Sequence, residues 1–230
     1  MKKNDIELEI LKLTVKELKP LLNEVVFLGG SIISLFVDEP SILEIRETLD
    51  VDCAIEISHR EDYEKFAKKL RKIGFSEDIT SKVICRFKKG ELLIDIMPTD
   101  EKILGFSNRW YKKAFKFAIE KKVNMNVIKV FDLPYLIATK IEAFKGRGKG
   151  QFMLSHDIED IVTLIDGCSS FHKIFQSTEA DVRTFVKNEF SQFIKDSNFT
   201  DAIDAHISDR VNVAGRKRIV LEKMRALVES

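Results

Sequence analysis

The stretch Thr48-Leu49-Asp50-Val51-Asp52 decides how this chain folds. It opens a run from Leu49 to Ile57 in which every second residue is apolar, a pattern typical of a half-buried β-strand. One face of that predicted strand carries Leu49, Val51, Cys53, Ile55 and Ile57. Because side chains alternate along a strand, Asp50 and Asp52 point together to the opposite face.

A third carboxylate belongs to the same pattern. Asp95 interrupts the apolar run Leu92–Met97, which also predicts a strand. Two aspartates one residue apart, with a third on another strand, can converge on two hard divalent cations. Mg²⁺ suits these oxygen ligands, with Mn²⁺ as an alternative, and it leaves room for water and substrate phosphates.

A glycine turn precedes these strands. Gly29-Gly30-Ser31 follows the apolar run Val25–Leu28 and precedes Ile32–Phe36, so we expect a strand, a turn and the start of a helix. Glycine lets a backbone approach a phosphate closely, and amides at a helix N-terminus bind anions. Alone, such a turn is common, and an Asp-x-Asp pair is more often a solvated strand face. The three pieces in this order predict a joint metal and phosphate site.

This order resembles the DNA-polymerase-β-type nucleotidyltransferase superfamily. More narrowly, the chain resembles the AbiEii-type nucleotidyltransferase family, which includes toxins of bacterial toxin–antitoxin and phage-defence systems. The resemblance covers Val25 to Gly167. The narrower match rests on Thr48–Asp52, Leu92–Asp100, Leu104–Tyr111, Ala138–Arg147 and Ser155–Asp166. One departure from the broad superfamily is the long interval of nineteen residues between Ser31 and Asp50, which suggests an added connection over residues 40–47.

The resemblance implies an activity and roles for particular residues. It implies transfer of a nucleoside monophosphate from a nucleoside triphosphate to RNA, such as a tRNA 3′ end, with a cognate antitoxin protein as a partner. Asp50, Asp52 and Asp95 would bind two Mg²⁺ ions. Nucleotide contacts would come from Gly29, Gly30, Ser31, Lys140, Asp157 and Asp160.

Several alternatives stay open. The acceptor can instead be a small molecule, as for aminoglycoside nucleotidyltransferases, or a protein hydroxyl. A different class of protein, a non-catalytic module that binds nucleotides or partners, fits the same fold. Lys140 can equally be a surface lysine of an amphipathic helix, and acidic residues at Asp157 and Asp160 suit the first turn of a helix.

Two basic features are equally open. Arg109, beside the single tryptophan Trp110, can hold a phosphate or can be a structural arginine next to a core anchor. From Arg109 to Lys149 there are eleven Lys or Arg residues against three Asp or Glu. That stretch steers a nucleotide or an RNA end, or it is a solvated face. The basic loop 145–150 covers a site or merely joins two helices.

Composition sets the remaining limits. The 230 residues contain 44% hydrophobic and 33% charged residues with a net charge of +1, which is ordinary for a soluble globular protein. Three scattered cysteines form no metal-binding spacing and fit a reducing cytoplasm. No apolar run approaches the ~20 residues of a membrane span, so we expect a cytoplasmic protein without a membrane partner.

The element pattern predicts a mixed α+β fold. Residues 1–132 would form a nucleotidyltransferase domain with a small mixed sheet flanked by helices, and residues 133–230 a helical bundle. Predicted helices in the first part are 5–23, interrupted at Pro20, then 32–37, 60–74 and 111–120. A hairpin of 82–87 and 91–97 turns at 88–90, and 123–130 is the last strand. Further helices are expected at 134–146, from 156 onward, and at 174–191, 193–206 and 216–227.

Overall fold

The computed structural model describes residues 3–40, 42, 45–46, 48–105, 107–148 and 150–230. Parts of the expected connection 40–47 and of the basic loop 145–150 therefore lie outside the described residues. The chain divides into a sheet unit, Asp5–Ile32 with Glu47–Asp132, and a helical unit, Ile33–Arg46 with Leu133–Ser230. The domain limits 1–132 and 133–230 stay a prediction about independent folding.

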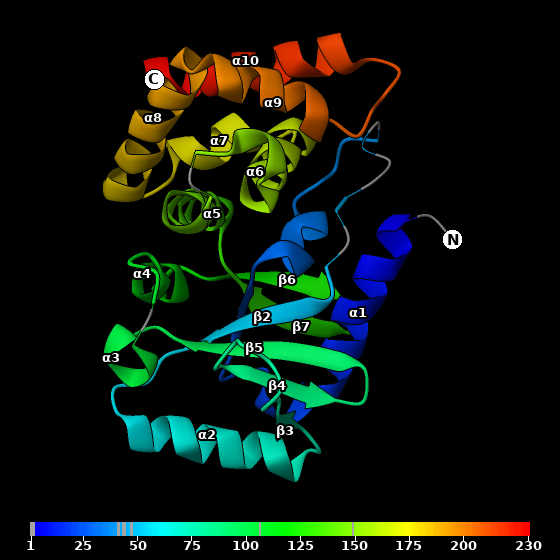
Figure 1. The fold of residues 1–230 in the computed structure, drawn as a ribbon, viewed down its shortest axis with the longest axis vertical. Helices are drawn as coiled ribbons and strands as arrows, with labels where there is room; N and C mark the ends of the chain where they lie inside the picture. Colours follow the sequence, from blue (N-terminus) through cyan, green and yellow to red (C-terminus); the bar gives the residue numbers. More distant parts are fainter. Residues whose placement is uncertain (1–2, 41, 43–44, 47, 106, 149) are drawn as a thin grey trace. The chain divides into compact units, whose positions relative to one another are not determined.

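The sheet unit is built on one mixed β-sheet (Figure 1). Among the described residues its seven strands lie in the order β3-β4-β5-β2-β1-β7-β6. The strands are β1 (Val26–Leu28), β2 (Asp50–Ile55), β3 (Ser76–Glu77), β4 (Arg86–Lys89), β5 (Leu92–Pro98), β6 (Ile119–Val123) and β7 (Asn126–Val130). The central strands β2 and β5 are parallel, while β1 and β4 run antiparallel to their partners β2 and β5.

Register and burial give the two faces of the sheet different characters. Val51 lies opposite Ile94, and Cys53 lies opposite Ile96, and all four side chains are buried. Asp50 and Asp52 alternate with these residues, so they lie on the other face, as the sequence predicts. The hydrophobic core therefore lies beneath one face of the central strands, and the acidic side chains gather on the other.

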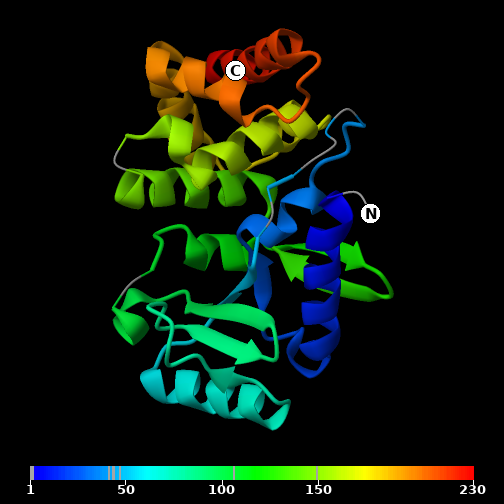
Figure 2. The same ribbon diagram turned by 45° about the vertical axis from the view of Figure 1, so that its right-hand side comes forward.

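Helices of the sheet unit follow from clear local signals. They are α1 (Lys3–Glu17), η1 (Lys19–Leu21), α2 (Arg60–Lys72), α3 (Glu101–Leu104) and α4 (Tyr111–Lys116). Helix α2 begins with acidic residues, ends with basic ones and buries one apolar face, which suits the helix dipole. Its Tyr63 hydroxyl donates to the Ile96 carbonyl at 3.2 Å, which fixes α2 to β5. In Figure 2, α2 runs beside the β3–β4–β5 end of the sheet.

The helical unit contains α5 (Leu133–Arg147), η3 (Phe152–Leu154), α6 (His156–Gly167), α7 (Phe171–Gln176), α8 (Ala180–Lys195), α9 (Ser197–His206) and α10 (Val213–Glu229). Ser155 caps α6 by accepting from the Ile158 amide. Aromatic rings fill its core: Phe144 and Phe152 have centroids 4.8 Å apart, and Phe193 and Phe199 have centroids 5.1 Å apart.

The predicted α+β class is confirmed, whereas several boundaries are wrong. The expected strand 49–57 is shorter, because Leu49 precedes β2 and is 74% exposed. The turn does not occupy residues 88–90. Lys88 and Lys89 belong to β4 and pair with β5, and the chain turns at Gly90, which has φ 58°.

Three further expectations also need correction. The expected helix 111–120 stops at Lys116, and Ile119–Val123 is an unpredicted strand that pairs with β7. The expected helix 174–191 is interrupted, since α7 ends at Gln176 and α8 begins at Ala180. The segment after Ser31 is a 3₁₀ helix, η2 (Gly30–Leu35), and not an α-helix.

Within the described residues, every helix is too short or too polar to cross a lipid bilayer.

Candidate active site

A row of charged residues crosses the face of the central strands that carries the acidic side chains. Asp52 on β2 lies directly opposite Asp95 on β5, and Arg86 on β4 lies opposite Asp95 from the other side. On the remaining side, Asp52 lies opposite Leu28, the last residue of β1. Since residues directly opposite on paired strands share a face, backbone pairing alone brings Arg86, Asp95 and Asp52 together. Asp50, two residues before Asp52, joins them on that face.

Gly29 follows β1 and touches this row. Its φ is +81°, a left-handed conformation that favours glycine. A methyl group at Gly29 would come within 1.9 Å of Asp52 Oδ2, so the Asp52 carboxylate packs against the bare glycine backbone. The predicted association of the glycine turn with the Asp-x-Asp pair is therefore present in the structure.

Gly30 and Ser31 begin the short helix η2 immediately after Gly29. Ser31 is only 2% exposed, and its hydroxyl finds no hydrogen-bond partner in the part of the chain that the structure describes. A buried hydroxyl without a partner destabilises the folded state. Ser31 is therefore a position where a ligand oxygen could accept the missing hydrogen bond. Because η2 is a 3₁₀ helix, the expected phosphate cradle cannot draw on a long helix dipole.

Arg86 is the residue of this row that sequence analysis did not predict. Its guanidinium donates to both Asp95 oxygens, from Nε to Oδ1 and from Nη2 to Oδ2, each at 2.8 Å. Nη2 also donates to Asp50 Oδ2. These bonds raise the pKa of Arg86 above its already high value, with Asp95 as the largest cause, so the guanidinium stays charged. Alternation with buried Phe87 places Arg86 on the opposite face of its strand, but only the hairpin register makes that face the acidic one.

The donor set suits a divalent metal ion, although the side chains are not arranged around one. Among the described residues, no three His, Cys, Asp or Glu side chains surround a common point. The positive charge between Asp50 and Asp95 comes instead from the Arg86 guanidinium, which takes the place that a metal ion would have. Carboxylate oxygens are what Mg²⁺ prefers, so Asp50, Asp52 and Asp95 match the predicted metal in the type of their donor atoms.

The neighbouring thiols are not nucleophiles. Burial raises the pKa of Cys85 to about 12, and the charge of Asp95 contributes in the same direction. Burial also raises the pKa of Cys53 well above its usual value, with further contributions from Asp52 and Asp95. Both thiols therefore stay protonated at neutral pH, so neither is available as a thiolate nucleophile.

A second cluster lies inside the helical unit. Lys140 of α5 donates to Asp160 Oδ2 of α6 at 2.5 Å, and its Nζ lies 3.8 Å from Asp157 Oδ1. Arg46 binds the same Asp160 through Nε at 3.3 Å and Nη2 at 3.2 Å. Lys140, Asp157 and Asp160 are all less than a tenth exposed. The structure thus brings these three predicted residues together and excludes a surface position for Lys140.

The charges in this second cluster determine the pKa of Asp160. Burial raises the pKa of Asp160, but attraction to Lys140 and Arg46 outweighs burial and holds its pKa below the usual range. Asp160 is therefore ionised at neutral pH, and the cluster is a set of charged groups that neutralise one another.

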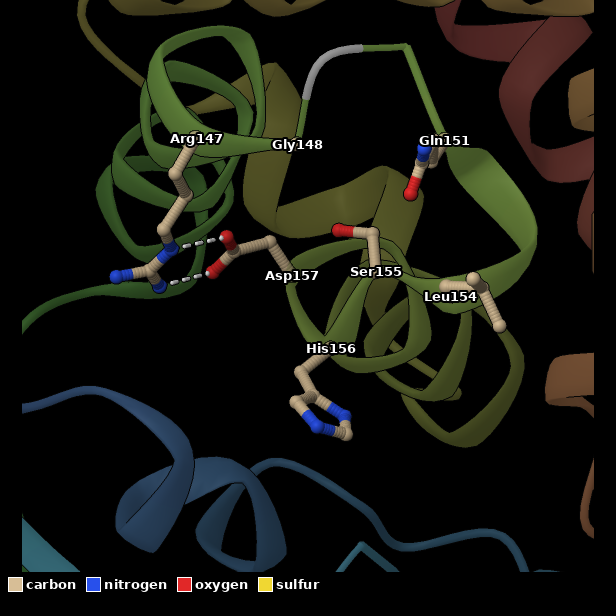
Figure 3. A pocket seen from close by; sticks show the side chains of 7 residues that line it. All are labelled: Arg147, Gly148, Gln151, Leu154, Ser155, His156 and Asp157. Carbon is tan, nitrogen blue, oxygen red and sulfur yellow. Dashed lines mark hydrogen bonds and ion pairs between the residues drawn. The ribbon is translucent and has the colours of Figure 1, made fainter.

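A pocket of about 250 Å³ opens where α5 ends and α6 begins, lined by Arg147, Gly148, Gln151, Leu154, Ser155, His156 and Asp157. Figure 3 shows the Arg147 guanidinium turned towards Asp157, while the His156 ring points away from that pair. The two contacts measure 3.0 Å from Nε to Oδ2 and 2.9 Å from Nη2 to Oδ1. Asp157 thus joins the buried lysine to an exposed arginine.

The predicted nucleotide contact Arg109 lies in the turn before α4. Its guanidinium lies 5.3 Å from the centroid of the Trp110 ring, and that ring is 7% exposed. This is the geometry of a cation–π contact over a core anchor, which agrees with the structural interpretation of Arg109.

Comparisons with known proteins place the fold. No protein-family model matches the sequence, and no curated protein matches it. The chain is similar to an antigenic nucleotidyltransferase-like protein from Paracoccidioides brasiliensis, with a TM-score of 0.50, 16% identity and 94% of each chain covered. Similarity to JHP933 from Helicobacter pylori has a TM-score of 0.45 and 11% identity, covering 97% of this chain and 92% of that one. The chain has the fold of nucleotidyltransferase-like proteins.

Proposed function

We propose that this chain is a metal-dependent nucleotidyltransferase that moves a nucleoside monophosphate from a nucleoside triphosphate to an acceptor hydroxyl. One observation carries the proposal. Asp52 and Asp95 lie opposite each other on parallel strands, and Gly29 packs against the Asp52 carboxylate. A carboxylate pair beside a close-approaching backbone suits a phosphate and its counter-ion better than it suits a solvated strand face.

Each residue of the row has a proposed task. When bound by Asp50, Asp52 and Asp95, Mg²⁺ would neutralise triphosphate charge and favour displacement at phosphorus. The acceptor oxygen attacks the α-phosphorus and pyrophosphate leaves. The Asp95 carboxylate takes the acceptor proton, directly or through water. The Gly30 amide and the buried Ser31 hydroxyl donate to phosphate oxygens.

The helical unit contributes a separate proposal. By resemblance, Lys140 contacts nucleotide phosphates, with Asp157 and Asp160 beside it. Its buried ion pairs support a positioned ammonium, although Asp160 already neutralises much of its charge. Lys140→Arg tests this role: if the nucleotide contact is real, the KM for nucleotide rises while the free energy of unfolding changes little.

The acceptor is proposed to be RNA, with a tRNA 3′ end as the first candidate, from the resemblance and from the basic stretch 109–149. Nucleotidyl transfer to a small molecule or to a protein hydroxyl is the alternative for the same site. A cognate antitoxin rests on the resemblance alone.

The experiment incubates the chain with each α-labelled nucleoside triphosphate, Mg²⁺ and total cellular RNA. Asp50→Asn/Asp52→Asn is the negative control, and Asp201→Asn, an exposed acidic residue of α9, is the matched control. We expect label in a tRNA-sized band with wild type and Asp201→Asn, and none with the double variant. Omitting RNA and adding cell extract distinguishes protein or small-molecule acceptors. Absence of labelled product under all conditions would refute the proposed function.

A further inference from the structure

The guanidinium of Arg86 already fills the cationic role between two of the three site carboxylates. It binds Asp95 through two parallel hydrogen bonds and Asp50 through a third. Two-point pairing of this kind is among the strongest ion pairs in proteins. The Arg86 side chain is 17% exposed and that of Asp95 is 8% exposed, so water screens the pair only partly.

The backbone fixes this pairing. Arg86 lies opposite Asp95 because Phe87 lies opposite Ile94, and both apolar side chains are buried, at 2% and 0% exposure. Slipping the β4–β5 register by one residue would turn Phe87 to the acidic face. The register of the hairpin therefore places the Arg86 charge beside Asp95.

We infer that Arg86 is an internal counter-cation that competes with the divalent metal ion for Asp50 and Asp95. This inference rests on the proposed function, since it requires a metal ion at these aspartates. Both Asp95 oxygens already accept hydrogen bonds from Arg86, so a metal ion that binds Asp95 has to share these oxygens with the guanidinium or displace it. A divalent ion is also repelled by the guanidinium charge at such short range.

The competition has a functional consequence. Without metal, Arg86 relieves the repulsion between Asp50 and Asp95. Guanidinium groups bind phosphate oxygens in the same two-point manner as carboxylates. A bound triphosphate can therefore accept Arg86 and release the two aspartates for the metal ion. The metal alone binds weakly, and the site assembles when nucleotide and metal are both present.

The test is the affinity of Mn²⁺ alone for the full chain, measured by calorimetry and by electron paramagnetic resonance of free Mn²⁺. Arg86→Gln is expected to bind Mn²⁺ about tenfold more tightly than wild type, because a nearby positive charge is removed. Arg86→Lys keeps the charge but loses the two-point contact, so a smaller increase is expected. Arg71→Gln is the matched control, because Arg71 makes a similar two-point contact with Glu77 away from the site.

Melting temperature provides a second readout. Without metal, Arg86→Gln should melt below wild type because Asp50 and Asp95 lose their shared partner. The same excess concentration of Mn²⁺ should raise its melting temperature more than that of wild type, since stabilisation by a ligand that binds only the folded state grows with the logarithm of its affinity. Arg71→Gln should respond to Mn²⁺ as wild type does.

The outcomes separate this inference from the proposed function. Unchanged or weaker Mn²⁺ affinity in a folded Arg86→Gln chain overturns the inference. Should Arg86→Gln fail to fold, unchanged affinity in Arg86→Lys overturns it. Asp52→Asn is expected to abolish Mn²⁺ binding in both the wild-type and the Arg86→Gln background. If Asp52→Asn binds Mn²⁺ as wild type does, the metal site and the proposed function both fail.

Discussion

The Asp52 carboxylate and the Cα of Gly29 pack so closely that a methyl group at Gly29 would lie 1.9 Å from Asp52 Oδ2. The turn after β1 therefore sets where the β2 carboxylate can lie. Glycine is needed at position 29 for two reasons. Its backbone adopts φ +81°, and the absence of a side chain leaves space for the Asp52 carboxylate.

Gly29→Ala is expected to impair the site beyond its effect on stability. The left-handed conformation costs a non-glycine residue about 1–2 kcal/mol. The collision additionally displaces Asp52, and a misplacement of ~1 Å can reduce catalysis by about 100-fold. Label transfer from α-labelled nucleotide, together with urea unfolding, measures both effects.

Gly105→Ala is the matched control for this prediction. Gly105 has φ +80°, but no heavy atom among the described residues lies within 4 Å of an added methyl group. It should show the conformational cost without the loss of transfer. Equal transfer activity in Gly29→Ala and Gly105→Ala would mean that the contact with Asp52 does not matter.

Lys140 and Asp160 should show strong energetic coupling. Removing one partner of a buried ion pair costs about 3–5 kcal/mol because the other charge is left uncompensated. We expect Lys140→Met and Asp160→Asn each to approach that cost, reduced for Lys140→Met because Arg46 still binds Asp160. The double variant should lose less than the sum of the two single losses. Urea unfolding of all four chains closes the thermodynamic cycle.

The exposed pair Lys65–Asp62 on α2 provides the comparison for that cycle. Lys65→Met should leave the free energy of unfolding nearly unchanged, because water screens an exposed pair. Additive losses at Lys140 and Asp160 would show that the buried contact does not couple the two residues.

Local sequence patterns were sufficient for the central strands and most helices. Alternation of apolar residues identified β2, the apolar run Leu92–Met97 identified β5, and acidic and basic ends marked α2. The strand β6 was not predicted because Ile119–Val123 is short and rich in charged residues. It lies at an edge of the sheet, where only pairing with β7 specifies a strand. The break between α7 and α8 was not predicted because apolar residues continue at helical spacing on both sides of Ser177.

The candidate site was partly predictable for similar reasons. Asp50 and Asp52 were identified because strand alternation places both carboxylates on one face, and Asp95 because it interrupts an apolar run. Arg86 was not, because its position depends on the register of a hairpin. The expected turn at 88–90 would place Arg86 opposite Leu92, whereas the observed turn after Lys89 places it opposite Asp95. Non-local pairing is information that periodicity does not carry.

Acid should weaken the contribution of Asp160 to stability. Lys140 and Arg46 outweigh burial and hold the pKa of Asp160 below its usual range, so its ionised form is favoured in the folded chain. A lowered carboxyl pKa stabilises the fold above the unfolded value of about 4, and this stabilisation is lost as pH falls through the lowered pKa. The stability difference between wild type and Asp160→Asn should be constant from about pH 5 to 7 and shrink below about pH 4.

Urea unfolding at a series of pH values measures this difference. In the Lys140→Met background the dependence on pH should flatten, because the strongest attraction that lowers the pKa is gone. A difference that grows as the pH falls would contradict the assignment of a lowered pKa to Asp160.

Lys223 joins α10 to the end of α6 and should be important for the stability of the helical unit. Its ammonium donates to the carbonyls of Ile165, Asp166 and Cys168 at 2.7, 3.1 and 2.9 Å, which satisfies acceptors that a helix end leaves unpaired. Lys223→Met should cost about 2–4 kcal/mol, because hydrogen bonds from a charged donor are lost and partly buried carbonyls remain. Lys217→Met, which removes a more exposed contact with Asp204 from the same helix, should cost below about 1 kcal/mol. Similar losses of unfolding free energy in the two variants would show that capping of α6 by Lys223 adds nothing beyond a surface ion pair.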